Sequence, residues 1–502
     1  MAIEFRDVSN RSVASKIFIE QEVANRRTSA GIMPHRIGVL GVSDNQASIE
    51  LNVPKRIRSK EEAIQEHGSR SLLAQMLSAV IEVAPNVEVY GIPVPALVGT
   101  RARGGIRIEG SATKFGFFSI LIGGQSLRVP VPVGTNPAVL ASTIEGAVTA
   151  AVDLPVTANA IDEFCFFSAA FSGDVGNQIH IAPDERYASE EPDGLTVTYF
   201  DIGSEVTFSG GNGAATRGVG DPSIATALAN LGALRITEIV SPFTTPGSLG
   251  ELIQAGIERN SPSIDRMFAG FVGINSDESA YTTTRGILNS EWLTFCPVFN
   301  SQTPGYIIGS TVTGVYANAQ QERIGIPMRS VILPGVLASP DTTPTHGRID
   351  EFVRTGSSHF VTREDGRVAI GDLVTTRTKT DEGKEIGDWR FTVVHSAIQY
   401  KRWSMELVFG ADPFKRAIAV PDDQITTVSH ALRKSTIKAY AMALVDDWGQ
   451  LAITRNVATV AANIEVEENA ENPARYDILI PDDQTSGLRI VAVKLSWSVY
   501  AQ

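Results

Sequence analysis

The chain has 502 residues, of which 43% are hydrophobic and 20% charged, a composition typical of a folded globular protein rather than a disordered one. The formal net charge of −13 argues against a dedicated nucleic-acid binder, because phosphate contacts need a basic surface. A chain of this length exceeds what one hydrophobic core supports, so we expect roughly two to four domains.

The two cysteines, Cys165 and Cys296, are too few for a disulfide framework and lie in apolar runs. We therefore expect buried free thiols and a reducing compartment. The chain does not open with a cationic segment followed by an apolar run, so we expect no secretory signal. The longest apolar stretches, such as residues 267–274, are far shorter than the ~20 residues that cross a bilayer, so we expect no insertion into a membrane.

Residues 1–30 predict an N-terminal arm. The segment is polar, but in its middle Val13, Ile17 and Ile19 fall on one face of an alternating pattern. A period of two is typical of a β-strand. Strand-forming chain ends can add to the edge of a sheet in a neighbouring copy.

An α/β pattern follows in residues 31–98. Residues 36–42 and 87–92 predict two apolar strands. Between them, Ser59 with Glu62 three positions later forms a capping box, and the apolar residues behind it recur at the spacing of an amphipathic helix. This order of elements predicts the first part of a core domain with a mostly parallel sheet.

Residues 99–213 predict a β-rich inserted domain. The stretch is rich in glycine and in short strand-like runs. A hairpin is predicted around Gly123 and Gly124, a helix behind the N-cap residue Asn136, and a further strand at residues 177–181. The change of texture separates this stretch from the segments on either side.

The α/β rhythm resumes in residues 214–345. Asp221 predicts the opening of one helix, Ser248 and Glu251 form a capping box for a second, and Asp277 can cap a third. Apolar strands are predicted between these helices. The simplest account is a single α/β core domain that the inserted domain interrupts.

Residues 346–480 differ again and predict a C-terminal α+β assembly domain. Residues 423–448 predict one long helix, because apolar positions recur there at helical spacing, and residues 476–480 predict a strand. The predicted fold class is therefore α/β in the core and α+β overall, in several domains with extended arms at both ends.

Residues 481–502 predict a C-terminal hinge and a terminal strand. Residues 489–500 alternate with a period of two, which gives one apolar face. That face carries Val491, Val493, Leu495, Trp497 and Val499. The connector from Pro481 to Gly487 is polar, has good turn chemistry and is interpreted as the hinge. The strand either folds back onto residues 476–480 of its own subunit or pairs with a neighbouring copy.

The sequence indicates no catalytic, cofactor-binding or metal-binding residues. It contains no phosphate-binding loop, nucleophile elbow or His-Glu-x-x-His motif, and the seven histidines are scattered. Acid/base roles for Glu66–His67 and Asp446–Asp447 are less probable than solvated helix faces. A basic cluster at residues 55–60 is best interpreted as a surface patch or subunit contact. Two strand-forming ends on a modular body favour an assembly subunit over an enzyme.

In the order of these parts the chain resembles the tail sheath proteins of contractile bacteriophage tails, of the Mu-like type, over essentially its whole length. The resemblance is carried by residues 53–57 through to 87–94, by residues 105–158, and by residues 463–467, 472–481 and 488–493. Residues 1–30 match the family in character more than in individual residues.

The resemblance implies a structural subunit that polymerises as stacked hexameric rings around a tail tube. Arms at both chain ends reach neighbouring subunits and complete a shared sheet, and the inserted domain lies outward. The sheath contracts to drive the tube through the host cell envelope, without catalysis or a cofactor. The implied partners are other copies of the chain, the tail tube protein, and baseplate and tail terminator proteins, with no nucleic acid. The implied location is the virion tail, assembled in the bacterial host cytoplasm.

The resemblance also implies roles for particular residues. The two alternating faces, with Ile17 and Ile19 at one chain end, become inter-subunit strands. The basic residues Arg433, Lys434 and Lys438 of the predicted long helix become candidates for contact with the tail tube, although a solvated helix face is an equally good explanation.

Three rival functions stay open. The first is the sheath of a genome-free contractile injection device, which the sequence does not separate from a phage sheath. The second is an α/β enzyme with a β-rich accessory domain, which would need a polar cluster in a cleft. The third, a surface-layer or adhesin subunit, is disfavoured by the missing export signal.

Overall fold

The structure is a computed structural model that describes residues 31–97, 99–204, 214–286, 288–340, 344–385, 387–424, 427–428, 430–472 and 474–497. The predicted N-terminal arm, with Ile17 and Ile19, and the last residue of the predicted apolar face, Val499, lie outside these ranges. Contacts divide the chain into two compact units. The larger unit contains Met33–Trp403, Leu451–Arg455 and the residues from Asp483 onward, and the smaller unit contains Ser404–Gln450 and Asn456–Asp482.

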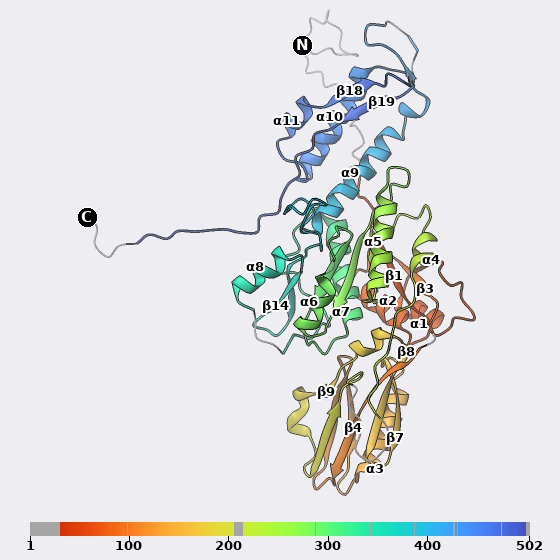
Figure 1. Ribbon diagram of the computed structural model, residues 1–502, viewed down its shortest axis with the longest axis vertical. Coiled ribbons are helices and arrows are strands. Elements are labelled where there is room, and N and C mark those ends of the chain that lie inside the picture. The colour runs from red at the N-terminus through yellow and green to blue at the C-terminus, as the bar shows by residue number, and fades with distance from the viewer. Residues whose placement is uncertain are drawn as a thin grey trace, which may run out of the picture. The chain divides into compact units, whose positions relative to one another are not determined.

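The larger unit is built on a six-stranded sheet with the order β13-β12-β11-β1-β3-β2 (Figure 1). Its strands are β1 (Arg36–Val42), β2 (Lys55–Ile57), β3 (Glu88–Val94), β11 (Glu238–Val240), β12 (Ala269–Ile274) and β13 (Leu293–Pro297). All neighbouring strands are parallel except β2, which pairs antiparallel with β3. The mostly parallel sheet predicted from the alternation of strands and helices is confirmed.

Helices cover this sheet. They are α1 (Lys60–His67), α2 (Leu72–Val83), α4 (Ala225–Ala229), α5 (Pro246–Asn260), α6 (Glu278–Arg285) and α7 (Gly305–Glu322). Helix α7 lies directly against β12, because a Cβ atom on Gly273 would lie 2.3 Å from the amide nitrogen of Gly309. Only glycine permits this approach, so the sheet and α7 form one close-packed layer pair.

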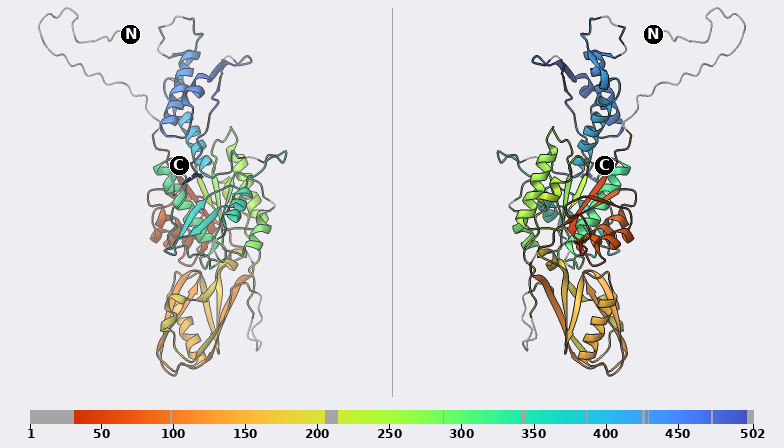
Figure 2. Two further views of the ribbon diagram at one scale, coloured as in Figure 1. Left: turned by 90° about the vertical axis from the view of Figure 1, so that its left-hand side faces the viewer. Right: turned by 90° about the vertical axis from the view of Figure 1, so that its right-hand side faces the viewer.

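The inserted segment forms two antiparallel sheets with the orders β10-β4-β8-β7 and β6-β5-β9. Its elements are β4 (Arg101–Gly110), β5 (Gly116–Ile122), β6 (Gln125–Val131), α3 (Pro137–Ala150), β7 (Val156–Ile161), β8 (Phe164–Ser172), β9 (Ile181–Pro183) and β10 (Leu195–Phe200), with 3₁₀ turns at Asp174–Gln178 and Glu185–Glu190. Helix α3 packs against strands of both sheets, as Figure 2 shows. The predicted hairpin is confirmed, and its turn residues Gly123 and Gly124 have φ values of 57° and 80°, which glycine adopts without strain.

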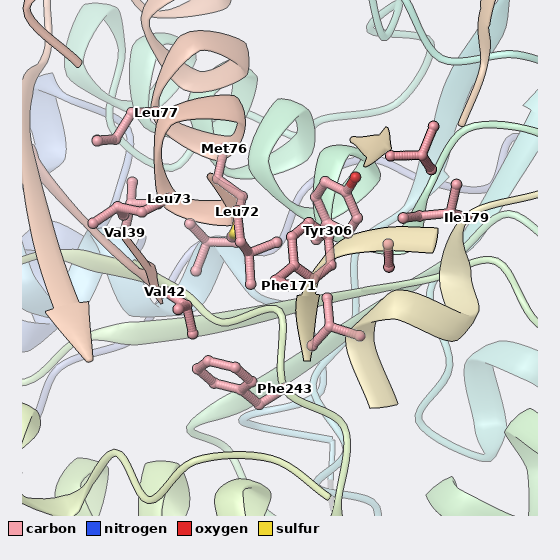
Figure 3. Close-up of a cluster of buried hydrophobic side chains, with 14 of the residues drawn as sticks. Val39, Val42, Leu72, Leu73, Met76, Leu77, Phe171, Ile179, Phe243 and Tyr306 are labelled. Carbon is pink, nitrogen blue, oxygen red and sulfur yellow. The ribbon is translucent and has the colours of Figure 1, made fainter. Parts of the chain in front are cut away.

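The inserted segment and the α/β sheet share one apolar core (Figure 3). The ring of Phe171, at the end of β8, meets the ring of Tyr306 edge-on with centroids 5.8 Å apart. Gln178 adds polar contacts, because its Oε1 accepts from the Tyr306 amide at 3.0 Å and its carbonyl accepts from Asn275 Nδ2 at 2.8 Å. Arg70 Nη2 donates to the carbonyl of Val148 near the end of α3 at 2.8 Å. The segment is therefore docked on the sheet and not merely tethered to it.

The remainder of the larger unit packs against β12, β13 and α7. It contains α8 (His346–Arg354), β14 (His359–Thr362), β15 (Val368–Asp372) and the first part of α9 (Val393–Phe409). Val368 and Ile370 of β15 share a buried cluster with Phe271 of β12 and Tyr316 of α7. For this reason the contact-based boundary lies after Trp403, later than the predicted start of a C-terminal domain at residue 346, and the domain boundaries stay a prediction.

The smaller unit contains the end of α9, a 3₁₀ turn (Phe414–Arg416), β16 (Ile418–Ala419), β17 (Ala431–Leu432), α10 (Lys434–Gln450), α11 (Val457–Ala462), β18 (Glu465–Glu468) and β19 (Tyr476–Leu479). Trp448 of α10 is buried and donates from Nε1 to Ser404 Oγ at 2.9 Å. Val460 of α11 and Val466 of β18 are buried as well. The unit therefore has a small core of its own.

The predicted helix over residues 423–448 is wrong at its start. Helix α10 begins at Lys434, because the carboxylate of Asp422 accepts from the Ser435 amide at 3.1 Å and from Ser435 Oγ at 2.9 Å. Just before the helix, β17 pairs in parallel with β16. A side chain distant in sequence and a strand pairing thus replace the first turns that the apolar spacing predicts.

Two helix starts in the core were assigned to the wrong side chains. Helix α5 begins at Pro246, and Glu251 lies inside it and accepts from the amides of Ile224 (2.6 Å) and Ala225 (3.2 Å) at the start of α4. In turn, Asp221 accepts from the Thr244 and Thr245 amides just ahead of α5. Each carboxylate thus accepts backbone hydrogen bonds at the start of the other helix or just ahead of it, which local spacing does not reveal.

The remaining predicted caps are confirmed. Ser59, Asn136 and Asp277 each accept a backbone hydrogen bond at the start of α1, α3 and α6. The predicted strand at 177–181 is wrong for most of its length, because a 3₁₀ turn ends at Gln178 and β9 starts at Ile181. Among the described helices, none combines the length and the apolar character that crossing a membrane requires.

Candidate functional site

The C-terminal arm, defined here as residues 490–497, exposes its apolar side chains. Within the described part of the chain these residues pair with no strand, and Figure 1 shows them as an extended segment. The exposed fractions of Val491, Val493, Leu495 and Trp497 are 71%, 82%, 83% and 78%, so none of these residues is buried. Burying one such side chain is worth about 1.5–3 kcal/mol, so covering the arm with a partner surface would release several kcal/mol of hydrophobic free energy.

In residues 489–497, the described part of the strand predicted over residues 489–500, no strand is therefore formed in a single copy of the chain. A strand needs a hydrogen-bonded neighbour, and the alternation of side chains does not supply one. Ile17, Ile19 and Val499 lie outside the described residues, so the structure places only the other four residues of the predicted inter-subunit strands.

The segment just before the arm, residues 483–489, is named the arm root, and contacts hold it to the larger unit. The Arg455 amide donates to the Asp483 carbonyl at 2.8 Å, and Arg455 Nε donates to Asp483 Oδ1 at 2.6 Å. Lys401 Nζ donates to Gln484 Oε1 and to the Ile453 carbonyl, both at 3.0 Å. The buried ammonium of Lys401 thus ties the arm root to residues 451–455.

Arg489 makes the last contacts of the arm root. Its guanidinium lies over the ring of Phe391, 3.2 Å from the centroid, and pairs with the carboxylate of Asp372. Its carbonyl accepts from Arg329 Nη1 at 2.9 Å. Burial lowers the pKa of Arg489 below its ordinary value, and the nearby carboxylate of Asp372 offsets only part of this shift. Side chain and backbone of Arg489 are therefore both fixed.

These contacts bear on the predicted hinge. Pro481 is exposed and precedes the arm root, whereas Gly487 lies inside it. A Cβ atom on Gly487 would lie 2.6 Å from Pro327 Cγ, so the glycine allows close packing in this structure rather than free rotation. The turn chemistry of residues 481–487 does not reveal this contact, because Pro327 is far away along the chain.

The smaller unit offers a two-stranded sheet. Strands β18 and β19 pair antiparallel from Glu465–Leu479 to Glu468–Tyr476. Among the described residues no third strand joins this sheet. Both outer edges therefore present backbone N–H and C=O groups that an extended segment can pair with.

The three predicted tube-facing residues lie together at the start of α10. Arg433 precedes the helix and donates from Nη2 to the Gln424 carbonyl at 3.1 Å. Lys434 is exposed and Lys438 is half-buried. Hydrogen bonds from Ser435 and the charges of Lys434 and Arg433 lower the pKa of Asp422, so this acidic group offsets part of the positive charge.

The other candidate sites are explained by local partners. In the basic cluster, Lys55 pairs with Glu66, Arg56 with Glu88, Arg58 with Glu62, and Lys60 with Glu82. His67 is buried beside Ser43, with its Nδ1 3.3 Å from Ser43 Oγ, and burial lowers its pKa. Glu66 and His67 therefore face different partners and do not form an acid/base pair.

The described residues also offer little for a metal or a reactive thiol. No group of three or more His, Cys, Asp or Glu side chains that could hold a metal ion occurs among them. Cys165 and Cys296 are free and buried, as predicted. Burial raises the pKa of Cys165 to about 12 and that of Cys296 further, which suppresses thiolate chemistry at both.

Sequence reasoning missed the residues that hold the arm root. Asp372, Phe391, Lys401 and Arg455 belong to three separate stretches and follow no shared spacing. Only the arginine at the start of the alternating segment, Arg489, was visible as a polar residue ahead of the apolar face. No local signal could have assigned it a partner.

Comparison with known proteins gives one match to a curated sequence. The chain is 20% identical over 493 residues to the Mu-like prophage FluMu tail sheath protein of Haemophilus influenzae, and the match covers 98% of this chain and 99% of that protein. No protein-family model matches the sequence.

Solved structures of low sequence identity also match. The sheath tail protein of Listeria innocua is 10% identical with a TM-score of 0.48, covering 91% of this chain and 93% of that one. The helical sheath of the anti-feeding prophage in its contracted state is 12% identical with a TM-score of 0.48, covering 97% and 99%. A tail sheath protein is a structural component and not an enzyme. Through the full-length sequence match, the resemblance to the Mu-like tail sheath family that the sequence indicated is confirmed.

Proposed function

We propose that the chain is the structural subunit of a contractile tail sheath, which polymerises as stacked hexameric rings around a tail tube and contracts to drive the tube through a host cell envelope. The observation that carries this proposal is the exposed, alternating C-terminal arm. A soluble chain that leaves Val491, Val493, Leu495 and Trp497 uncovered needs a partner surface for them. A second copy of the same chain supplies that surface.

The geometry of the arm suits a link between subunits. Its eight residues, extended at about 3.3 Å each, reach about 26 Å beyond the arm root. Each backbone hydrogen bond contributes about 0.5–1.5 kcal/mol net, and burial of the apolar face adds to this. One arm therefore provides several kcal/mol of association, repeated at every subunit.

The open sheet of β18 and β19 is the acceptor that we favour for a neighbour's arm. It has only two strands, so its edges can pair on both sides. Strand β18 carries Glu465, Glu467 and Glu468, and the polar face of the arm carries Lys494, so the charges are complementary. The N-terminal arm, with Ile17 and Ile19, would complete the same shared sheet.

Such links allow contraction without dissociation. A strand that stays paired while rigid bodies rotate keeps neighbouring subunits connected through the transition. The extended sheath then stores energy as a kinetically trapped state, and contraction releases it. Pro481 and Gly487 stay our candidates for hinge motion of the C-terminal segment in any step that releases the arm root.

The remaining partners and the location follow from the same proposal. The subunit would contact the tail tube protein and, at the ends of the sheath, baseplate and tail terminator proteins. It would be assembled in the bacterial host cytoplasm and reside in the virion tail. The sheath of a genome-free contractile injection device uses the same subunit physics, and the presence or absence of packaged DNA in purified particles separates the two.

Arg433, Lys434 and Lys438 are proposed to face the tail tube. Reversing all three charges should weaken co-sedimentation of sheath with tube and leave sheath self-assembly unchanged. A matched control reverses Arg354, Arg363 and Arg367, which are exposed on the larger unit. Equal tube binding in both triple variants would assign the three residues to a solvated helix face.

The central test of the proposal removes the arm. Deletion of residues 490–502 should leave a soluble, folded chain that no longer forms tubes or stacked rings in electron micrographs. Replacing Val491, Val493, Leu495 and Trp497 by threonine, which keeps strand propensity but removes the apolar face, should have the same effect. Replacing Ala492 and Ser496 on the opposite face by threonine is the control and should leave assembly intact. Tubes formed by the deleted chain would contradict the proposal.

A further inference from the structure

The arm leaves the larger unit at a fixed point rather than from a loose connector. The arm root is held first at Asp483 and Gln484, through Arg455 and Lys401, and again at its end through Arg489. After Arg489, each large apolar side chain of the described arm is exposed. The boundary between held and exposed chain therefore falls between Arg489 and Ile490.

The Arg489 site is more than a surface ion pair. Surface pairs contribute little to stability, because solvent screens the charges and two flexible side chains must be ordered. Here the side chains of Arg489 and Asp372 are only 21% and 25% exposed, and the guanidinium also lies over the Phe391 ring. A planar guanidinium can pair with a carboxylate and stack on a ring at once, which a lysine ammonium cannot do as well.

The backbone at this residue is fixed independently of its side chain. Arg329 Nη1 donates to the Arg489 carbonyl at 2.9 Å, so the direction of the chain at the start of the arm is set as well as its position. Release of the arm root from the larger unit would therefore require the side-chain and the backbone contacts of Arg489 to break.

We propose that Arg489 is the anchor of the C-terminal arm. Together with Asp372 and Phe391 it fixes where the arm leaves the larger unit and passes tension from a neighbouring subunit directly to that unit. The arm then pivots at Ile490, beyond the predicted hinge at Pro481–Gly487. This inference rests on the proposed function of the arm as a link between subunits.

Mobility of the arm root tests the anchor without any assembly. Both native cysteines are buried, so a spin label or fluorophore can be attached selectively at Ser486→Cys, inside the arm root, or at Lys494→Cys, in the arm. Arg489→Ala should increase probe mobility at position 486 and leave probe mobility at the exposed position 494 unchanged. Arg354→Ala, which breaks an exposed ion pair with Asp350 on α8, is the matched control and should change neither.

Two conservative variants test whether probe mobility rises in steps, and they keep the test possible if Arg489→Ala does not fold. Arg489→Lys keeps the charge but loses the planar stack, and Asp372→Asn keeps the shape but loses the charge. Both should give probe mobility between the values of the parent and of Arg489→Ala. Unchanged mobility at position 486 in both conservative variants would overturn the anchor.

Assembly gives the second readout. Arg489→Ala should raise the protein concentration needed for tube formation at least about tenfold over the Arg354→Ala control. Without its charged hydrogen bond and its stacked ring, the arm root of each subunit would no longer be held to its own larger unit, so every link would be weaker. If deletion of 490–502 abolishes tubes while Arg489→Ala assembles like the control, the anchor is wrong and the proposed function stands. If the deleted chain still forms tubes, the proposed function is wrong, and probe mobility still decides whether Arg489 holds the arm root.

Discussion

At the scale of single residues, buried polar groups define where this chain is sensitive to its surroundings. His395 on α9 is fully buried between Trp292 and Trp389, with ring centroids 5.7 Å and 5.1 Å away. Burial lowers the pKa of His395 to about 4. The imidazole is therefore neutral in the folded chain at ordinary pH.

The depressed pKa of His395 predicts acid sensitivity with a definite sign. Between the unfolded pKa of about 6.5 and the folded value the unfolded chain binds more protons, so stability falls as the pH falls through this window. The full shift corresponds to about 3 kcal/mol at most. Burial also lowers the pKa of His67 and of His359, which act in the same direction.

Replacement of His395 by phenylalanine should flatten the pH dependence of unfolding between pH 6.5 and pH 4. Phenylalanine keeps an aromatic side chain between the two tryptophans but binds no proton. Urea unfolding at several pH values measures the effect, with His346→Asn, at an exposed position, as the control. A slope equal to that of the control would show that His395 does not contribute to acid sensitivity.

At the scale of elements, the sequence predicts what local spacing determines and fails where a distant residue intervenes. The caps at Ser59, Asn136 and Asp277 and the hairpin at Gly123 and Gly124 depend on neighbours within a few residues, and these predictions are confirmed. Asp221, which precedes α4, accepts a hydrogen bond just ahead of α5, and Glu251 of α5 accepts one at the start of α4. No rule of local spacing reveals these partners.

The candidate site follows the same division. Alternation identifies the apolar face of the arm, because a period of two is a local property. The anchor is invisible in the sequence, because Arg489 and Asp372 are 117 residues apart in the chain. The contacts of Gly487 are invisible for the same reason, because its neighbour Pro327 lies far away along the chain. The hinge at residues 481–487 itself stays a prediction.

The inserted segment provides a prediction at the scale of elements. Replacing residues 99–213 by a short Gly/Ser linker should leave ring and tube formation intact, because the segment forms sheets of its own while the six-stranded sheet continues without it. The same change should lower the melting temperature, because Phe171 no longer covers Tyr306 and Gln178 no longer bonds Asn275.

Electron microscopy and calorimetry of this variant check both parts. Tyr306→Ser in the shortened chain is a useful companion, since it makes the newly exposed surface more polar. A shortened chain that is folded but never forms tubes would place the inserted segment in the assembly interface and contradict the prediction.

At the scale of the whole molecule, the chain combines a well-packed larger unit with two elements that lack a partner among the described residues. The larger unit buries its sheet, its helices and the docked segment in a continuous core, whereas the C-terminal arm remains exposed and the sheet of β18 and β19 remains open at both edges. Complementary unfinished elements on one chain are what a polymer of identical subunits requires.

The most direct test of this account is an atomic structure of the assembled polymer by cryo-electron microscopy. We predict that backbone hydrogen bonds from Val491 to Val499 run to the sheet of β18 and β19 in a different copy of the chain, with Arg489 still seated on Phe391 and Asp372 of its own copy. An arm that instead pairs with β19 of its own chain, in a polymer held together by other surfaces, would contradict the account.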